Sequence, residues 1–295
     1  MNPLKPGLIA TAAALLLAGT AYAEGAAPNA DKRALNLAVQ RDGQRNQSVA
    51  AAVSLPVGER AWVQFGAGQS RSRDAVSGSS VKPKQVSVGG GVAGKVWQAS
   101  VNASQRCDGD RLCQTDLVAA ADWRPVEGVN VGVDAVKRNA KARGTLAAGG
   151  PVEQRVKGHG VGVHGAVAVT QRFTVYGATM RNRYKTSTQQ TTGGSGGLLA
   201  GVPLLQNRVT AVNRDEAALD RSHQLGATYR VSERVALNGE VMQDRLHDGG
   251  SLRSVLMKAA IAAGAGWTLT PGIGRSRGLQ GEGVNYGLLG ASYAW

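Results

Sequence analysis

Apolar and polar residues alternate along almost the whole chain after residue 32, and turn residues interrupt the alternation at short intervals. Residues 97–104, for example, read Trp-Gln-Ala-Ser-Val-Asn-Ala-Ser. A period of two places alternate side chains on opposite faces of a β-strand, whereas an amphipathic helix needs spacings of three and four. The sequence therefore predicts an all-β protein. The predicted strands cover residues 35–39, 49–55, 61–67, 86–92, 97–103, 117–123, 129–135, 161–169, 173–175, 225–231, 235–241, 255–261, 267–273 and 289–295.

The connections between these segments are alternately short and long. The long ones cover about residues 71–83, 105–114, 139–154 and 185–220, with shorter ones at 42–47, 246–250 and 276–283. Outer-membrane barrels have tight turns at one end and longer loops at the other, whereas a soluble β-sandwich has no reason to segregate its loops. We therefore predict a transmembrane up-and-down antiparallel β-barrel of about 14 strands, with 12 or 16 as the alternatives.

The connection at residues 185–220 is the longest and leaves two alternatives open. It begins with a Thr/Gln/Gly/Ser-rich stretch and then contains the apolar sequence of residues 198–205. A loop of this length is usually functional or disordered. It either folds into the lumen as a constriction or extends the barrel outward as a hairpin, and the second alternative raises the strand count to sixteen.

Composition alone gives a different impression. The mean hydropathy is −0.18 and the formal net charge is +14, as in a basic soluble domain. An apolar outer face and a polar inner face average to the same value, so a polar mean does not exclude a membrane barrel. After the first two dozen residues no run of about 18 apolar residues occurs, which excludes a spanning helix.

The first 23 residues have the pattern of a secretory signal peptide. Lys5 precedes an uncharged apolar stretch over residues 8–21, and Ala21-Tyr22-Ala23 provides a small-x-small cleavage site. We expect residues 1–23 to be removed and residues 24–295 to form one outer-membrane β-barrel domain. Export leads to an oxidising compartment, in which Cys107 and Cys113 can form a disulfide within a predicted extracellular loop.

Tryptophan placement provides a separate argument for the barrel. All five tryptophans fall at strand ends on the side of the short turns. Indole rings prefer the boundary between the lipid headgroups and the membrane interior. We predict an aromatic girdle at that end. It consists of Trp62, Trp97, Trp123, Trp267 and Trp295.

The final segment, residues 285–295, resembles the C-terminal strand of Gram-negative outer-membrane β-barrel proteins. Such strands end in an aromatic residue preceded by alternating apolar positions, here Trp295, Tyr293, Ala291 and Leu289. The resemblance implies a location in the outer membrane and insertion by the barrel-assembly machinery, which would recognise the strand ending in Trp295. It identifies a porin-like barrel without a subfamily.

The predicted inner face is composed mostly of Gly, Ser, Thr, Gln, Asn and Ala, and an aqueous channel follows as the leading hypothesis. A barrel of about fourteen strands has a lumen too wide for small side chains to fill. Charges of both signs are expected there, Asp116, Arg138 and Arg234 among them, so strong anion selectivity is not predicted. The candidate pore-lining residues are Gln64, Gln98, Asn102, Asp122, Asp134, Arg230, Glu240 and Lys258.

Basic residues gather at the loop-side ends of the predicted strands, where the phosphates of lipopolysaccharide lie. Arginine binds phosphate through two parallel hydrogen bonds, so lipid and lipopolysaccharide are the expected partners. An exported chain without aromatic residues interleaved among its basic ones is not expected to bind nucleic acid. These basic residues are Arg71, Arg73, Lys82, Lys84, Arg138, Lys141, Arg143, Arg181, Arg183, Lys185, Arg253, Arg275 and Arg277.

The expected function is passive diffusion of small hydrophilic solutes. The alternative is a structural or accessory barrel that serves an export or surface complex, and a barrel hydrolase is a weaker alternative. Ser222 and His223 are sequence neighbours and so face opposite sides of a strand, which is poor geometry for a nucleophile and its base. Asp244, His247 and Asp248 lack a second acidic pair. No enzymatic activity, cofactor or metal site is expected.

Overall fold

The computed structural model describes residues 33–43, 46–73, 80–109, 112–145, 151–190, 219–246, 251–277 and 283–295. The predicted signal peptide, the loop residues 191–218, and His247 and Asp248 lie outside these ranges. The described residues form strands joined by turns, which confirms the all-β prediction. No helix in the described ranges is long and apolar enough to cross a membrane.

The described ranges contain fifteen strands. Their bounds are β1 Ala34–Asp42, β2 Gln47–Val57, β3 Ala61–Arg73, β4 Ser80–Val81, β5 Lys84–Ala93, β6 Trp97–Asp108, β7 Leu112–Trp123, β8 Val129–Thr145, β9 Pro151–Ala168, β10 Phe173–Gln190, β11 Leu219–Arg230, β12 Val235–Leu246, β13 Ser251–Gly264, β14 Trp267–Arg277 and β15 Gly283–Ala294.

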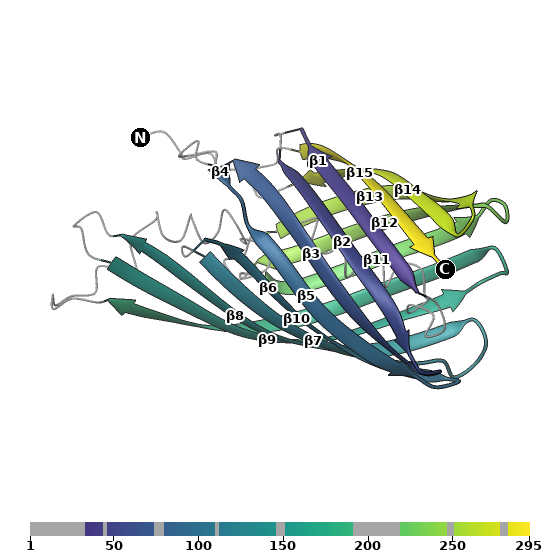
Figure 1. Ribbon diagram of the computed structural model, residues 1–295, viewed down its shortest axis with the longest axis horizontal. Helices are drawn as coiled ribbons and strands as arrows, with labels where there is room; N and C mark the ends of the chain where they lie inside the picture. The colour runs from purple at the N-terminus through teal and green to yellow at the C-terminus, as the bar shows by residue number, and fades with distance from the viewer. Residues whose placement is uncertain are drawn as a thin grey trace.

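The strands close into one antiparallel barrel (Figure 1). Apart from β4, each strand pairs with the strands before and after it, and β1 pairs with β15, so that Ala34 lies opposite Ala294. The two-residue β4 pairs only with the end of β3, and β3 pairs with β5 in the wall. The wall therefore consists of the other fourteen strands, as the sequence predicts.

The two ends of the barrel differ as the loop lengths predict. The short-turn end carries the six tight connections that join β2 to β3, β5 to β6, β7 to β8, β9 to β10, β11 to β12 and β13 to β14. We call the opposite end the loop end. There β8, β9 and β10 are the longest strands and project beyond the rest of the wall (Figure 1).

Two predicted loops at the loop end are shorter than expected. Strand pairing continues to Asp108 and resumes at Leu112 in place of a loop over 105–114. It likewise continues to Thr145 and resumes at Pro151 in place of a loop over 139–154. The sequences of these extensions lack the run of alternating large apolar residues that marks a membrane strand, because a strand above the membrane needs no apolar face.

The two faces of the wall carry different residues. Most large hydrophobic side chains, such as Leu37, Phe65, Val133 and Met257, point outward and are exposed. Residues of the opposite parity point inward and are mostly small or polar. Such alternation is what a barrel needs when its outer face contacts lipid and its inner face contacts water.

Aromatic side chains on the inner face lie over glycines of the neighbouring strand. An added Cβ at Gly226 would meet the ring of Tyr176, and one at Gly91 would meet the ring of Trp62. Gly274 and Tyr286 form a third such pair. The missing side chain is therefore a steric requirement at these positions, because the ring occupies the space of a Cβ.

Replacing Gly226 with alanine is expected to lower the free energy of unfolding by about 1–3 kcal/mol, because the methyl group displaces the Tyr176 ring. Gly239 is the matched control, since a Cβ there meets nothing within 4 Å. Its alanine variant is expected to be neutral or more stable by up to about 1 kcal/mol. Urea unfolding in lipid vesicles, followed by tryptophan fluorescence, measures both. Equal stability of the two variants would contradict the steric account.

Candidate functional site

Charged side chains on the inner wall are mainly acidic, although the chain as a whole is basic. Arg106, Arg138 and Lys258 are the inward-facing cations within the described wall, and Arg230 ends β11 at the rim. Six inward-facing carboxylates there outnumber these cations, and five remain when Asp42, the last residue of β1, is left out. They are Asp42, Asp116, Asp122, Asp134, Glu240 and Asp244.

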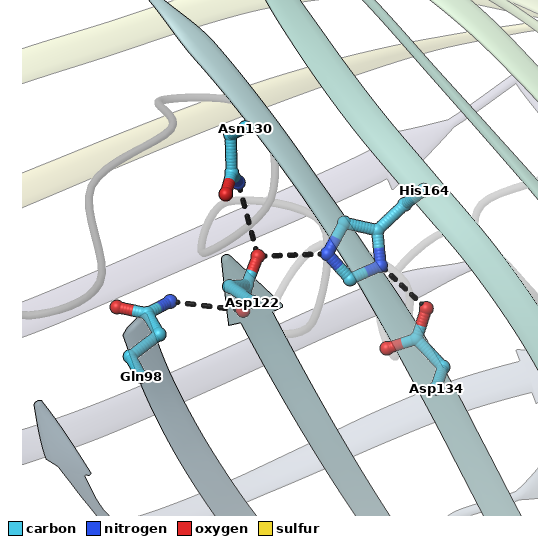
Figure 2. Close-up of polar contacts among 5 residues, drawn as sticks. All are labelled: Gln98, Asp122, Asn130, Asp134 and His164. Carbon is cyan, nitrogen blue, oxygen red and sulfur yellow. Dashed lines mark hydrogen bonds and ion pairs between the residues drawn. The ribbon is translucent and has the colours of Figure 1, made fainter. Parts of the chain in front are cut away.

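The densest group of polar contacts lies on β6, β7, β8 and β9, towards the short-turn end (Figure 2). At its centre His164 lies between two carboxylates. Its Nδ1 is 2.7 Å from Asp134 Oδ2, and its Nε2 is 2.8 Å from Asp122 Oδ1. Asp122 also accepts hydrogen bonds from Gln98 and Asn130, each at 3.0 Å. We call these five residues the His164 cluster.

The strand register explains why the His164 cluster forms. Gly132 lies between Asp122 and His164 in the same row across β7, β8 and β9. Because Gly132 has no side chain, the imidazole lies over it and reaches the carboxylate two strands away. The side chain of His164 is only 7% exposed and those of both aspartates 9%. The cluster is thus a packed part of the wall.

The net charge of the His164 cluster is negative in either state of the imidazole. Two ionised carboxylates give −2 with a neutral ring and −1 with a protonated ring. A charge in the wall acts on ions over several ångströms, since the Debye length is about 10 Å at 0.1 M salt. The cluster therefore gives this part of the barrel a negative potential without direct contact to a solute.

A second polar group lies on β10, β11 and β12. The Tyr176 hydroxyl donates to Glu240 Oε2 at 3.1 Å, and Asn238 donates to the Tyr176 oxygen at 3.0 Å. Asn238 also contacts Thr228 at 3.0 Å. Tyr176 reaches Glu240 by crossing Gly226, as His164 crosses Gly132. This group again places a carboxylate on the inner wall.

Nearer the loop end, Arg138 pairs with Asp116 at 2.9 Å and donates to the Tyr184 hydroxyl at 3.2 Å. The sequence pattern predicts Arg138 both among the inward charges and among the loop-side basic residues. The structure shows the first placement to be correct, because Arg138 faces the interior together with Asp116. Its charge is thereby balanced.

The structure places the predicted pore-lining residues as follows. Gln64, Gln98, Asn102, Asp122, Asp134, Glu240 and Lys258 all point inward from the middle or the short-turn part of their strands. Gln98, Asp122 and Asp134 come together in the His164 cluster, whereas Gln64 and Lys258 lie on other parts of the wall. Arg230 is exposed at the end of β11, and Arg234 lies in the turn before β12. Whether any of them contacts a passing solute stays a prediction.

One aromatic assignment is wrong. Trp62 points inward and is only 6% exposed, so it does not belong to an outward girdle. It has the same parity as Gln64, a signal that the alternation already contained. Trp97, Trp123, Trp267 and Trp295 are exposed on the outer face. Tyr293 stacks between the last two, with centroid distances of 4.8 and 5.3 Å. Their position at a membrane boundary stays a prediction.

Sequence reasoning missed His164 as a central residue and did not expect apolar side chains inside. His164 alternates with outward Val163 and so could have been placed on the inner face. Leu256, Tyr286 and Leu288 form a buried cluster on the inner side of β13 and β15. Apolar residues of both parities occur in β13, and this blurs the alternation there.

Two further expectations concern reactive groups. The described residues contain no group of three or more His, Cys, Asp or Glu side chains that could hold a metal ion. Ser222 donates to Asp244 at 2.6 Å on the inner face, and His223 lies 2.9 Å from Thr179 on the outer face. The two neighbours thus face opposite sides of β11, as expected, so they cannot act together as nucleophile and base.

Cys107 and Cys113 form the predicted disulfide. They are directly opposite each other on β6 and β7, at the loop end of the hairpin. The bridge ties the two strands together next to their connection.

No protein-family model and no curated protein sequence matches the chain. Several solved structures share its fold. A Pseudomonas aeruginosa FadL homologue is 9% identical with a TM-score of 0.57, covering 89% of this chain and 90% of that one. The CymD monoaromatic hydrocarbon channel is 10% identical with a TM-score of 0.53, covering 89% and 87%.

The COG4313 outer membrane channel from Pseudomonas putida F1 is also similar. It is 9% identical with a TM-score of 0.50, and the match covers 90% of this chain and 95% of that chain. At such low identity the likeness concerns the fold alone. The chain has the porin-like fold of outer-membrane β-barrel proteins.

Proposed function

We propose that this barrel is a channel through which small hydrophilic solutes diffuse passively across the outer membrane. The observation that carries the proposal is the composition of the inner wall. Carboxylates, amides, hydroxyls and a histidine line a closed barrel of fourteen strands. An eight-stranded barrel is filled by its own side chains, whereas a barrel of fourteen strands has a wider lumen. Polar groups that face a wide barrel interior are satisfied by water, as in porins.

The charge of the inner wall adds a preference for cations over anions to this proposal. The inward carboxylates outnumber the inward cations, and the His164 cluster holds two of them close together. Rings of acidic side chains favour cations in channels. The channel is therefore proposed to pass cations and cationic solutes more readily than anions, despite the net charge of +14 for the whole chain.

The apolar cluster of Leu256, Tyr286 and Leu288 does not oppose a polar pathway. These side chains pack on one another and are each less than a tenth exposed, so they offer little surface to a solute. A charge acts at a distance, whereas an apolar group acts only through contact. An accessory barrel that serves an export complex is the other reading, and no contact in the described residues favours it.

Single-channel recording of the purified chain in planar bilayers tests the proposal. We expect discrete conductance steps in KCl and, under a salt gradient, a reversal potential of the sign for cation preference. Migration on a gel that changes with heating shows that the inserted protein is folded. A folded, inserted protein that never conducts would refute the channel. Conduction with anion preference would refute only the cation preference.

A further inference from the structure

The outer face of the barrel carries its charges in one zone. Among the strand residues whose side chains the structure describes, every outward-facing lysine and arginine lies towards the loop end, and no carboxylate faces outward. The short-turn end instead carries Trp97, Trp123, Trp267 and Trp295 on its outer face. The cations are Arg41, Arg71, Lys84, Lys137, Lys141, Arg155, Lys157, Arg181, Arg183, Arg221, Arg245, Arg253, Arg275 and Arg277.

Three of these arginines form an unbroken row across β10, β11 and β12. Arg181 lies directly opposite Arg221, and Arg221 directly opposite Arg245. All three are exposed. Side chains in such pairs are about 5 Å apart at Cβ, and like charges at this spacing destabilise a sheet. The one recorded ion pair in the row, Arg221 Nε with Asp220 at 3.6 Å, is half-exposed and long.

The row lies at the height where a membrane-spanning strand leaves the hydrocarbon region. Counted from the short-turn end, Arg181, Arg221 and Arg245 are the ninth, tenth and eleventh residues of their strands. A strand tilted by about 45° crosses the hydrocarbon region in about 9–11 residues. Apolar residues such as Val175, Leu225 and Val241 fill the outer face below the row.

We propose that Arg181, Arg221 and Arg245 form a binding site for the phosphate groups of lipopolysaccharide in the loop-side leaflet. The inference rests on the outer-membrane location and not on the channel activity. Phosphate groups on a lipid would neutralise three adjacent guanidinium groups, beside which Asp220 supplies one carboxylate, 3.6 Å from Arg221 Nε. The planar guanidinium also binds two phosphate oxygens at once, which a lysine ammonium cannot do. Arg253 and Arg277, also directly opposite each other, extend the same zone to β13 and β14.

The test is binding of bisphosphorylated lipid A to the purified full chain in detergent, measured by native mass spectrometry. We expect the R181Q/R221Q/R245Q variant to bind at least about ten-fold more weakly, since the loss of even one hydrogen bond between charged groups weakens binding by about that factor. The R60Q/R172Q/R234Q variant removes the same charge from exposed short turns and is expected to bind like the original chain. The R181K/R221K/R245K variant keeps the charge and is expected to give an intermediate loss.

Two comparisons identify the ligand chemistry. Lipid A without its phosphates is expected to bind as weakly to the original chain as bisphosphorylated lipid A binds to the glutamine variant. Inorganic phosphate at millimolar concentration is expected not to displace lipid A. Equal binding by the glutamine variant and the original chain would overturn the proposal, and so would an equal loss in the short-turn variant. Displacement by inorganic phosphate would show an anion site and overturn the lipid assignment.

Discussion

Replacing Asp122 and Asp134 with asparagine is expected to lower the ratio of potassium to chloride permeability by at least about three-fold. A unit charge about 7 Å from an ion in water contributes about 0.6 kcal/mol, which changes the local concentration of that ion by about three-fold. Potassium and chloride change in opposite directions, so about three-fold is the lower limit for their ratio. Asparagine has nearly the same shape as aspartate, and its amide can still form hydrogen bonds with His164. The reversal potential in a planar bilayer under a KCl gradient measures the change.

The matched control for this experiment removes two carboxylates from outside the wall. Glu59 and Glu233 are exposed in short turns, where bulk salt screens them. The E59Q/E233Q variant is expected to shift the reversal potential less than the D122N/D134N variant does. A D122N/D134N channel with the reversal potential of the original chain would show that the His164 cluster does not set selectivity.

Replacing His164 with alanine is expected to lower the free energy of unfolding by about 3 kcal/mol. Removing one partner of a buried charged group leaves the other uncompensated, which costs about 3–5 kcal/mol. Here Asp134 would lose Nδ1 of the ring and Asp122 would lose Nε2, and the side chains of both aspartates are only 9% exposed. Urea unfolding in lipid vesicles, followed by tryptophan fluorescence, gives the difference.

His223 provides the control for this variant. It lies on the outer face of β11, is exposed, and contacts Thr179 alone among the recorded hydrogen bonds. The H223A variant is expected to change stability by no more than about 0.5 kcal/mol. The D122N/D134N background should recover part of the loss in H164A, since no charge is then left without a partner. If H164A unfolds at the same urea concentration as H223A, the His164 cluster is not a stabilising network.

The fold was predictable because a barrel wall repeats one rule at every strand. In each strand alternate residues face the lipid, so the orientation of residues such as Val131 and Val133 can be predicted without knowing the neighbouring strand. Strand ends were less predictable. At β8 and β9 the polar residues beyond the membrane pair as regular strands, and backbone hydrogen bonds hold them whatever the side chains are.

The candidate site was only partly predictable for a related reason. Alternation places Asp122, Asp134 and Gln98 on the inner face, but it does not state which residues of different strands lie opposite one another. Trp62 shows the same limit. Its position near a short turn indicated a membrane boundary, whereas its parity with Gln64 placed it inside, and parity prevails because a strand side chain cannot turn to the other face.

The local sequence thus specifies strand, turn and face, because these depend on each residue and its immediate neighbours. The register between strands depends on how fourteen strands close on themselves. That closure brings His164 across Gly132 to Asp122, and it aligns Arg181, Arg221 and Arg245 in one row. Both features join residues far apart in the chain, so only the tertiary structure determines them. The alternation along each strand places the carboxylates inside and the cations outside, and the register then brings them together as one cluster and one row.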